Sequence, residues 1–501
     1  MERVAPRQVL YEQQLPLAIE STSQRRIFFP EGGSTYGPSG GGNNPNVCRI
    51  PISADDLLDP TESFLQFKFT NNSGDTMVPD IGVPFLRRVR IESSGTTLED
   101  ISEYGTLYAN LVACQASQGG YTEATITTSG LTSINGTGTN AGNTTALTDG
   151  AVATAALGAF TGAGGDQSAA ITAAKAAATT VVQAAIRAGG NAQTVNVQLG
   201  GNHPPNTTIA DGASVFYNVP LVSALLNSKK YLPLVFMNGG LTLELEFDIA
   251  ESAGAYAGGA ANFQIENVRY MAHMVQLQRD FYDKLRMVME GSGGVLQLAG
   301  TTYRHFQSTY ANATSATIPL PAKVKSMKGL LFVEKNSADI GDRQRFYVSN
   351  SLINGTNEIQ LRVGSMVYPP TSIKIDNAGG AVLNKGEIYQ ELRKLFGTLG
   401  DYTHGGVLLN NSTFMAGNPN AANAAAGAGG ATAALLNPKA ISLESFKGNL
   451  ESGINSADKN LSMSLELRRS GGPANTTRVD MYAMCDAIFY VNLDGSVSSS
   501  V

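Results

Sequence analysis

The stretch YLPLVFMNGGLTLELEFDIAES, residues 231–252, decides the fold of this chain. An apolar run is followed by an Asn-Gly-Gly turn and then by a segment in which apolar and polar residues alternate strictly. One face carries Leu241, Leu243, Leu245 and Phe247, and the other carries Thr242, Glu244 and Glu246. Successive side chains of a β-strand point to opposite faces of the sheet, so this period predicts a strand that is buried on one face only.

Other segments repeat this alternation, notably residues 63–70 (SFLQFKFT), 459–469 (KNLSMSLELRR) and 476–495 (TTRVDMYAMCDAIFYVNLDG). The abundance of Gly, Asn, Thr and Ser, with 55 Gly and only 15% charged residues, is typical of turn-rich all-β proteins. The strands predict a core that contains Leu65, Phe67, Phe69, Leu241, Leu243, Leu245, Phe247, Leu461, Met463, Leu465, Leu467, Val479, Met481 and Phe489.

Three segments have helical spacing instead. Residues 96–113 predict a helix capped by Thr96 or Thr97, in which Glu99 and Asp100 favour the positive end of the helix dipole. Residues 277–289 place apolar side chains at i, i+4 and i+8, which predicts a helical connector that ends at the glycines of 291–294. Residues 386–400 form a third apolar stripe.

The two halves of the chain run through the same order of elements, which indicates a duplication. Leu241 matches Leu461, and Val268 matches Val479. Each half has about eight candidate strands, one helix and one low-complexity insertion, at 116–210 and 404–437. We therefore predict an all-β protein of two tandem eight-stranded jelly rolls, with short helices and long loop insertions. The predicted division is an N-terminal arm 1–45, jelly roll 1 at 46–277, a helical connector 278–294 and jelly roll 2 at 295–501.

The 95-residue insertion 116–210 carries only five charged residues, whereas a solvated disordered segment is normally more charged. Its Ala-rich part, 166–190, predicts a helix that ends at glycine. Three sequons begin at Asn135, Asn143 and Asn206. Chance in an Asn/Thr-rich tract without a secretion signal is the favoured explanation, and glycosylation of exposed sequons stays open.

Three stretches carry a resemblance to a known family: VRIESSGTTLEDISEYGTLY (89–108), KKYLPLVFMNGGLTLELEF (229–247) and VDMYAMCDAIFYVNLDG (479–495). From Arg49 onward the chain resembles the double jelly-roll major capsid proteins of icosahedral DNA viruses, of the polinton-like virus, virophage and large algal virus type. The resemblance implies a homotrimer, which forms a pseudo-hexameric capsomer and packs with neighbouring trimers into the facets of a virion.

The same resemblance implies that the insertions build towers on the outer surface, where a host surface is within reach, and that the arm lies inside. It also implies minor capsid or penton proteins as partners and assembly in the host cytoplasm or nucleus. The sequence leaves open whether a membrane lies beneath the shell.

Charge and cysteine content exclude several other classes of protein. A formal net charge of −6 gives no support for a chain that mainly binds phosphate backbones, so no sequence-specific nucleic-acid binding is predicted. The Arg pairs 25–26, 87–88 and 468–469 are interpreted as surface or interface charge. Three cysteines without a CxxC pair indicate a reducing environment, and no secretion signal or run of about 18 apolar residues is present. We therefore expect a soluble protein that is cytosolic or is released from a cytosol.

No constellation of catalytic, cofactor-binding or metal-binding residues emerges from the sequence, so we predict no enzyme activity and no cofactor. The four histidines (His203, His273, His305 and His404) lie in different elements, and GTGTNAG at 136–142 lacks the spacing of a dinucleotide loop. Glu99, Asp100 and Glu103 are interpreted as partners of a helix dipole, and Cys114 and Cys485 as small core residues.

The predicted function is therefore a major capsid subunit that acts by self-assembly. Two alternatives stay open at this point. A carbohydrate-binding or adhesive β-sandwich of a cell surface or appendage needs an export signal and exposed aromatic residues or calcium ligands. A β-sandwich glycoside hydrolase needs two carboxylates that face one cleft.

Overall fold

In the computed structural model, the described residues are 21–115, 209–396, 437–443, 453–469 and 476–501, apart from gaps at 40–43, 81, 229, 257–259, 292, 312, 338–339, 344–345, 347, 349–350, 352–355, 376, 379–380, 383, 385 and 458–460. The predicted insertions 116–210 and 404–437 lie almost entirely outside these residues. So do the Ala-rich segment 166–190 and the three sequons. No helix among the described residues is long and apolar enough to cross a membrane.

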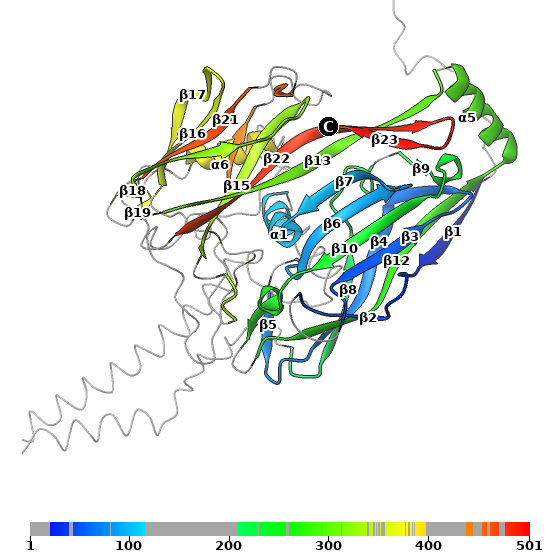
Figure 1. The fold of residues 1–501 in the computed structure, drawn as a ribbon, viewed down its shortest axis with the longest axis horizontal. Helices are drawn as coiled ribbons and strands as arrows, with labels where there is room; N and C mark the ends of the chain where they lie inside the picture. The colour runs from blue at the N-terminus through cyan, green and yellow to red at the C-terminus, as the bar shows by residue number, and fades with distance from the viewer. Residues whose placement is uncertain are drawn as a thin grey trace, which may run out of the picture.

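The first half of the chain folds into two antiparallel sheets that face each other, and each is built on four principal strands (Figure 1). One sheet has the order β1-β12-β4-β8 and the other has the order β3-β10-β6-β7. The bounds of these strands are β1 Ser21–Phe28, β3 Val47–Ile52, β4 Leu57–Asn71, β6 Leu86–Ser93, β7 Thr96–Ser102, β8 Ser214–Val219, β10 Leu241–Phe247 and β12 Phe263–Leu277. Two shorter strands extend the first sheet: β2 (Thr35–Tyr36) pairs with β12, and β9 (Leu232–Pro233) pairs with β4. Strands β5 (Met77–Pro79) and β11 (Gly254–Tyr256) form a separate two-stranded sheet.

The second half repeats this architecture. Its two sheets have the orders β13-β22-β15-β20 and β14-β21-β16-β17. The bounds are β13 Val295–Tyr310, β14 Ser315–Leu320, β15 Met327–Asn336, β16 Thr356–Val363, β17 Met366–Lys374, β20 Lys439–Ser442, β21 Met463–Arg469 and β22 Thr477–Asn492. The C-terminal strand β23 (Val497–Ser500) pairs with the end of β22, and β18 (Asn377–Ala378) pairs with β19 (Ala381–Val382).

Both halves follow one connection rule. When the eight principal strands of a half are numbered along the chain, the sheets have the orders 1-8-3-6 and 2-7-4-5 in each half. Strands that are neighbours in the sequence therefore lie mostly in opposite sheets, which is the double Greek-key connection of a jelly roll. The prediction of two tandem eight-stranded jelly rolls is confirmed.

Strand β10, the alternating part of residues 231–252, lies where its pattern predicts. In β10, Leu243 lies between Ile50 of β3 and Ile91 of β6. In β21, Leu465 lies in the same way between Ile318 of β14 and Leu361 of β16. Leu243 therefore corresponds to Leu465, and the predicted match of Leu241 with Leu461 is displaced by two residues.

The predicted core residues are confirmed as buried with one exception. Leu461 is half-buried and packs against the core from the segment before β21. The other thirteen predicted positions have less than a tenth of their surface exposed. Burial of one face along each strand supplies the main stabilisation, since apolar surface removed from water contributes about 25 cal/mol per Å².

The N-terminal boundary differs from the prediction. Residues 21–28 do not belong to an arm, because they form β1, which pairs with β12 along its whole length. Seven of its eight residues are exposed. A strand without a buried face has no apolar alternation, so the pattern that revealed the other strands is missing here.

The first predicted helix is wrong in its first part. Residues 96–102 form β7, and helix α1 runs only from Tyr104 to Gln115. A register shift lies between Ile91 and Glu92 of the neighbouring β6, where β7 carries an extra residue. This bulge turns both Leu98 and Ile101 toward the core, so buried side chains recur after three residues and imitate a helical period.

The other two predicted helices are present. Helix α5 (Arg279–Gly291) joins β12 to β13, and helix α6 (Gly386–Leu395) follows β17. Ile388, Leu392 and Leu395 of α6 are buried, as its apolar stripe predicts. Helices α1 and α6 occupy the same place in the two jelly rolls, between the fifth and the sixth principal strand.

Candidate functional site: the junction between the jelly rolls

The two jelly rolls meet along an interface that is built from different strands on its two sides. The edge strand β7 of the first jelly roll packs against β13 and β23 of the second, and the start of α1 meets β15 and β22 (Figure 1). We call this interface the junction. It contains two clusters of buried polar groups, one around Glu99 and one around Asp480, which the sequence did not predict.

Glu99 of β7 is buried in the junction and accepts hydrogen bonds from both jelly rolls. Its Oε1 atom accepts from the Ala224 backbone N at 2.9 Å and from Oγ1 of Thr302, a β13 residue, at 2.5 Å. Its Oε2 atom accepts from Oγ of Ser223. The three donors satisfy a carboxylate that would otherwise be costly to bury, because an unpaired buried charge loses its hydration without compensation.

Burial raises the pKa of Glu99 above its ordinary value, and the hydrogen bonds from Ala224, Ser223 and Thr302 only partly oppose this shift. The folded protein therefore binds the proton of Glu99 more tightly than the unfolded chain does. Stability from this group is fully present below the pKa of the unfolded state and is lost as the pH rises through the folded pKa.

We expect the free energy of unfolding of the native protein, minus that of Glu99→Gln, to fall as the pH rises through this window. Glutamine keeps the shape and an acceptor but cannot ionise. Guanidinium denaturation at a series of pH values measures the difference. Asp100→Asn is the matched control, because Asp100 is the next residue of β7 and forms a half-exposed ion pair with Arg88. A pH-independent difference for Glu99→Gln would show that the carboxyl group does not titrate on folding.

Two glycines allow close backbone approach across the junction. A Cβ atom on Gly300 of β13 would lie 2.5 Å from the carbonyl oxygen of Ala224. A Cβ atom on Gly495 would lie 2.8 Å from Cβ of Asn238, which belongs to the Asn-Gly-Gly turn of the opening stretch. The Asn238 backbone N donates to the Gly495 carbonyl at 2.8 Å, so this turn connects the two jelly rolls.

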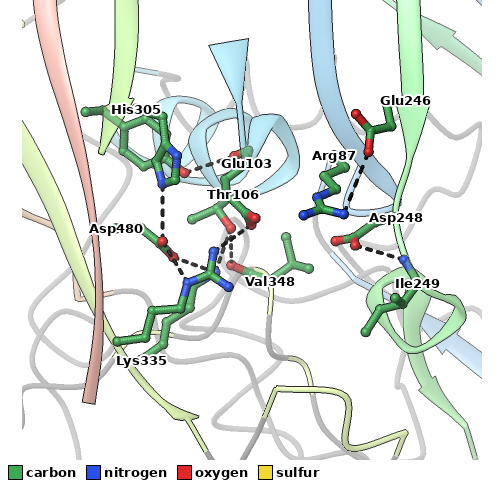
Figure 2. A network of polar contacts seen from close by, with 12 residues as sticks. Arg87, Glu103, Thr106, Glu246, Asp248, Ile249, His305, Lys335, Val348 and Asp480 are labelled. Atoms are coloured by element: carbon green, nitrogen blue, oxygen red, sulfur yellow. Dashed lines mark hydrogen bonds and ion pairs between the residues drawn. The ribbon is translucent and has the colours of Figure 1, made fainter. Parts of the chain in front are cut away.

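A second polar cluster centres on Asp480 of β22, which has no exposed surface (Figure 2). Nε2 of His305 lies 3.2 Å from its Oδ1 atom, and Nε of Arg478 donates to the same oxygen at 2.8 Å. Nζ of Lys335 lies 3.6 Å from its Oδ2 atom. One carboxylate thus faces a lysine, an arginine and an imidazole, all from the second jelly roll.

The first jelly roll completes this cluster through α1 and the residue before it. Nζ of Lys335 donates to Oγ1 of Thr106 at 2.6 Å, and Nη2 of Arg478 lies 2.9 Å from Oε2 of Glu103. The hydroxyl of Tyr482 donates to the backbone carbonyl of Glu103 at 2.9 Å. Glu103 has a left-handed backbone with φ of 50°, so the chain turns sharply there to present both its carbonyl and its carboxylate. Two carboxylates and two cations balance each other across the junction.

The charges of this cluster shift the pKa of Asp480. Burial acts to raise it, but the hydrogen bond from His305 and the positive charges of Lys335 and Arg478 outweigh burial and hold the pKa of Asp480 below its usual range. Asp480 is therefore ionised at neutral pH and acts as the anion that the surrounding cations require.

A third cluster lies inside the second jelly roll. Glu334 of β15 accepts from Nζ of Lys439 at 2.8 Å, from Nη2 of Arg469 at 2.9 Å and from Oγ1 of Thr356 at 3.0 Å. The guanidinium of Arg469 also lies over the ring of Tyr310, 4.1 Å from its centre. Burial lowers the pKa of Arg469 to about 10, so this side chain stays charged at neutral pH.

The comparisons with known proteins rest on structure. No protein-family model and no curated protein sequence matches this chain. A chain of the PBCV-1 virus capsid model has 12% sequence identity and a TM-score of 0.52, with 98% of this chain and 99% of that chain covered. A chain of the Sputnik virophage structure has 12% identity and a TM-score of 0.51, with 100% and 93% covered. The mavirus major capsid protein has 11% identity and a TM-score of 0.50, with 100% and 95% covered.

The chain has the double jelly-roll fold of viral major capsid proteins. The match covers the whole double jelly roll, including both halves and their order. At 10% to 12% identity the likeness establishes the fold alone.

The acidic residues predicted as helix partners have other roles in this double jelly roll. Glu99 and Asp100 lie on strand β7 rather than in a first helical turn, so the interpretation as dipole partners is wrong for both. Glu99 enters the junction and Asp100 pairs with Arg88 on the surface. On an edge strand, the residues around an acidic side chain are the same kind whether that side chain is buried or exposed. The local sequence therefore does not reveal that Glu99 is buried and Asp100 is not.

The histidines and cysteines that the structure describes lie in different parts of the double jelly roll. His305 lies in the junction and His273 is half-buried in β12, whereas His203 and His404 lie outside the described residues. Burial raises the pKa of the free thiols of Cys48 and Cys485, to about 11 and about 12, which keeps both protonated. Cys114 lies in α1.

The arginine pairs divide between the surface and the interior. Arg25 and Arg26 lie on the exposed strand β1, and Arg87 and Arg88 form half-exposed ion pairs with Glu246 and Asp100. Arg468 is exposed, but Arg469 is buried against Glu334 inside the second jelly roll, so the interpretation as surface or interface charge is wrong for this residue. Across the described ranges, no group of three or more His, Cys, Asp or Glu residues could hold a metal ion.

Proposed function

We propose that this protein is the major capsid subunit of an icosahedral virus and that it forms pseudo-hexagonal trimers that build the facets of the shell. The observation that carries the proposal is the buried, polar junction between two jelly rolls of the same plan. A shell subunit must keep its shape while many copies pack around it. The buried network fixes the orientation of the two jelly rolls, because another orientation would leave its polar groups without hydrogen-bond partners.

The junction supports a trimer for a second reason. It is heterologous, because the face of the first jelly roll (β7 and α1) differs from the face of the second (β13, β22 and β23). Heterologous contacts repeat head to tail and form a ring when the rotation closes. Three chains place six similar jelly rolls in such a ring, and a hexagonal outline allows one protein to tile a flat facet.

The remaining parts of the proposal follow from the capsid role. The protein acts by assembly and not by catalysis, and its location is the virion. Neighbouring trimers are its principal partners, and minor capsid or penton proteins, an internal membrane and a host surface are further candidates. We also propose the connector 278–294 as the boundary between the two jelly rolls, with the first beginning at β1.

The test is the mass of the purified protein in solution, followed by electron microscopy. We expect a stable assembly of about three times 52.5 kDa with a hexagonal outline. Glycan-array binding of the same sample tests the adhesive alternative. A monomer that binds sugars would overturn the capsid proposal in favour of a carbohydrate-binding surface protein.

A further inference from the structure

We infer that strand β1 of one copy of this chain is the docking surface for strand β17 of a second copy. This inference rests on the proposed function and names the contact that would close the trimer. The two strands lie on opposite ends of the molecule, β1 on the far side of the first jelly roll and β17 on the far side of the second (Figure 1).

The junction within the chain supplies the template for this contact. Strand β7 is the last strand of its sheet and packs against β13, the first strand of the second jelly roll. By position in the fold, β17 corresponds to β7, and β1 corresponds to β13. The chain therefore buries β7 and β13 against each other in the junction, and it leaves their counterparts β17 and β1 at its two ends.

Exposure of the corresponding strands follows this division. Strand β1 is exposed at seven of its eight residues, whereas β13 is at least partly buried at most positions. On β7 the edge residues Leu98 and Glu99 are buried, whereas on β17 the stretch from Met366 to Ser372 is half or fully exposed. What is covered at the junction is uncovered at the two ends.

The exposed strands also carry large apolar side chains whose exposure to water is unfavourable. Ile27 of β1 is 38% exposed and Phe29, next to its end, is 63% exposed. Met366 of β17 is 62% exposed. Exposed apolar residues grouped at the edge of a sheet mark an interaction site, and a free edge strand is itself a template for a further chain.

A second copy is the occupant that these observations favour. Each chain exposes β1, the counterpart of β13, and β17, the counterpart of β7. The junction shows that β13 and β7 fit each other, so β1 of one copy is expected to fit β17 of another. Because the two surfaces lie at opposite ends, the contact is head to tail and every copy uses both. A partner of another kind would have to fit only one of them.

The experiment uses the full chain and compares three single variants by mass in solution. Ile27→Asp and Met366→Asp are each expected to abolish the trimer and leave folded monomers, with unchanged far-ultraviolet circular dichroism. Phe216→Asp is the matched control, because Phe216 is 49% exposed on β8, the opposite edge strand of the same sheet as β1. It should retain the trimer.

Disulfide cross-linking between copies makes the test independent of folding defects, because it detects a contact that forms and not one that is lost. The double variant Ile27→Cys with Met366→Cys should form disulfides between copies under oxidising conditions, which yields covalent dimers and trimers on a denaturing gel. Ile27→Cys combined with Phe216→Cys should not. If the native protein is a trimer but both aspartate variants stay trimeric and no covalent trimer forms, this docking surface is wrong while the proposed function stands. A monomeric native protein would overturn both.

Discussion

Aspartate at Leu465 or at Leu243 is expected to abolish soluble, folded protein. Leu465 has no exposed surface and Leu243 is 1% exposed, each in the central strand pair of its sheet. An ionised carboxylate between two packed sheets finds no partner, and its burial costs at least several kcal/mol. Native proteins are stable by only about 5 to 15 kcal/mol, so one such group removes most of the margin. Expression yield of soluble protein and size-exclusion chromatography measure the effect.

The neighbouring residue provides the control for this variant. Ser464 precedes Leu465 in β21, points to the opposite face and lies opposite Arg362 of β16. Ser464→Asp should therefore fold and assemble normally, since the new carboxylate reaches solvent and a cation. Normal yield and trimer formation of both leucine variants would contradict the assignment of β10 and β21 as strands that are buried on one face.

Asn in place of Asp480 is expected to destabilise the protein by about 3 to 5 kcal/mol, the usual cost of removing one partner from a buried ion pair. The substitution keeps the shape of the side chain but leaves Lys335 and Arg478 without the anion that compensates their burial. Since the pKa of Asp480 is held below its usual range, its contribution is present above the pKa of the unfolded state. It is lost only as the pH falls through the lower folded pKa. Guanidinium denaturation at neutral pH measures the effect.

An exposed pair in the same jelly roll is the control for this prediction. Arg362 and Glu466 form an ion pair at 2.6 Å, with 49% and 28% of their side-chain surfaces exposed. Glu466→Gln should cost no more than about 1 kcal/mol, because water and salt screen such a pair. Equal effects of Asp480→Asn and Glu466→Gln would show that the junction does not depend on its buried anion.

Much of the fold could be predicted because its cause is local. The alternation in 241–247 and in 461–469 reports which side chains face the core, and this property needs only the geometry of an extended chain. The same order of strands and helices in the two halves then indicates a repeated plan. The exceptions, β1 and the start of α1, are places where exposure or a bulge removes or changes the period.

The junction could not be predicted in the same way. Thr302 and Glu99 are 203 residues apart in the chain, and Tyr482 and Glu103 are 379 residues apart. Each of these residues is an ordinary polar side chain in its own segment. Nothing in the neighbouring residues distinguishes Glu99, which is buried, from Asp100, which is half-exposed on the surface.

The sequence by itself determined that this protein is built from strands with one buried face and that it contains two sandwiches of one plan. Only the tertiary structure decided which strand edges meet and which charges the meeting buries. The physical reason is the separation along the chain of the residues that each property depends on. Side-chain alternation is a property of a few consecutive residues, whereas the burial of Asp480 and Glu99 depends on surfaces brought together from distant parts of the chain.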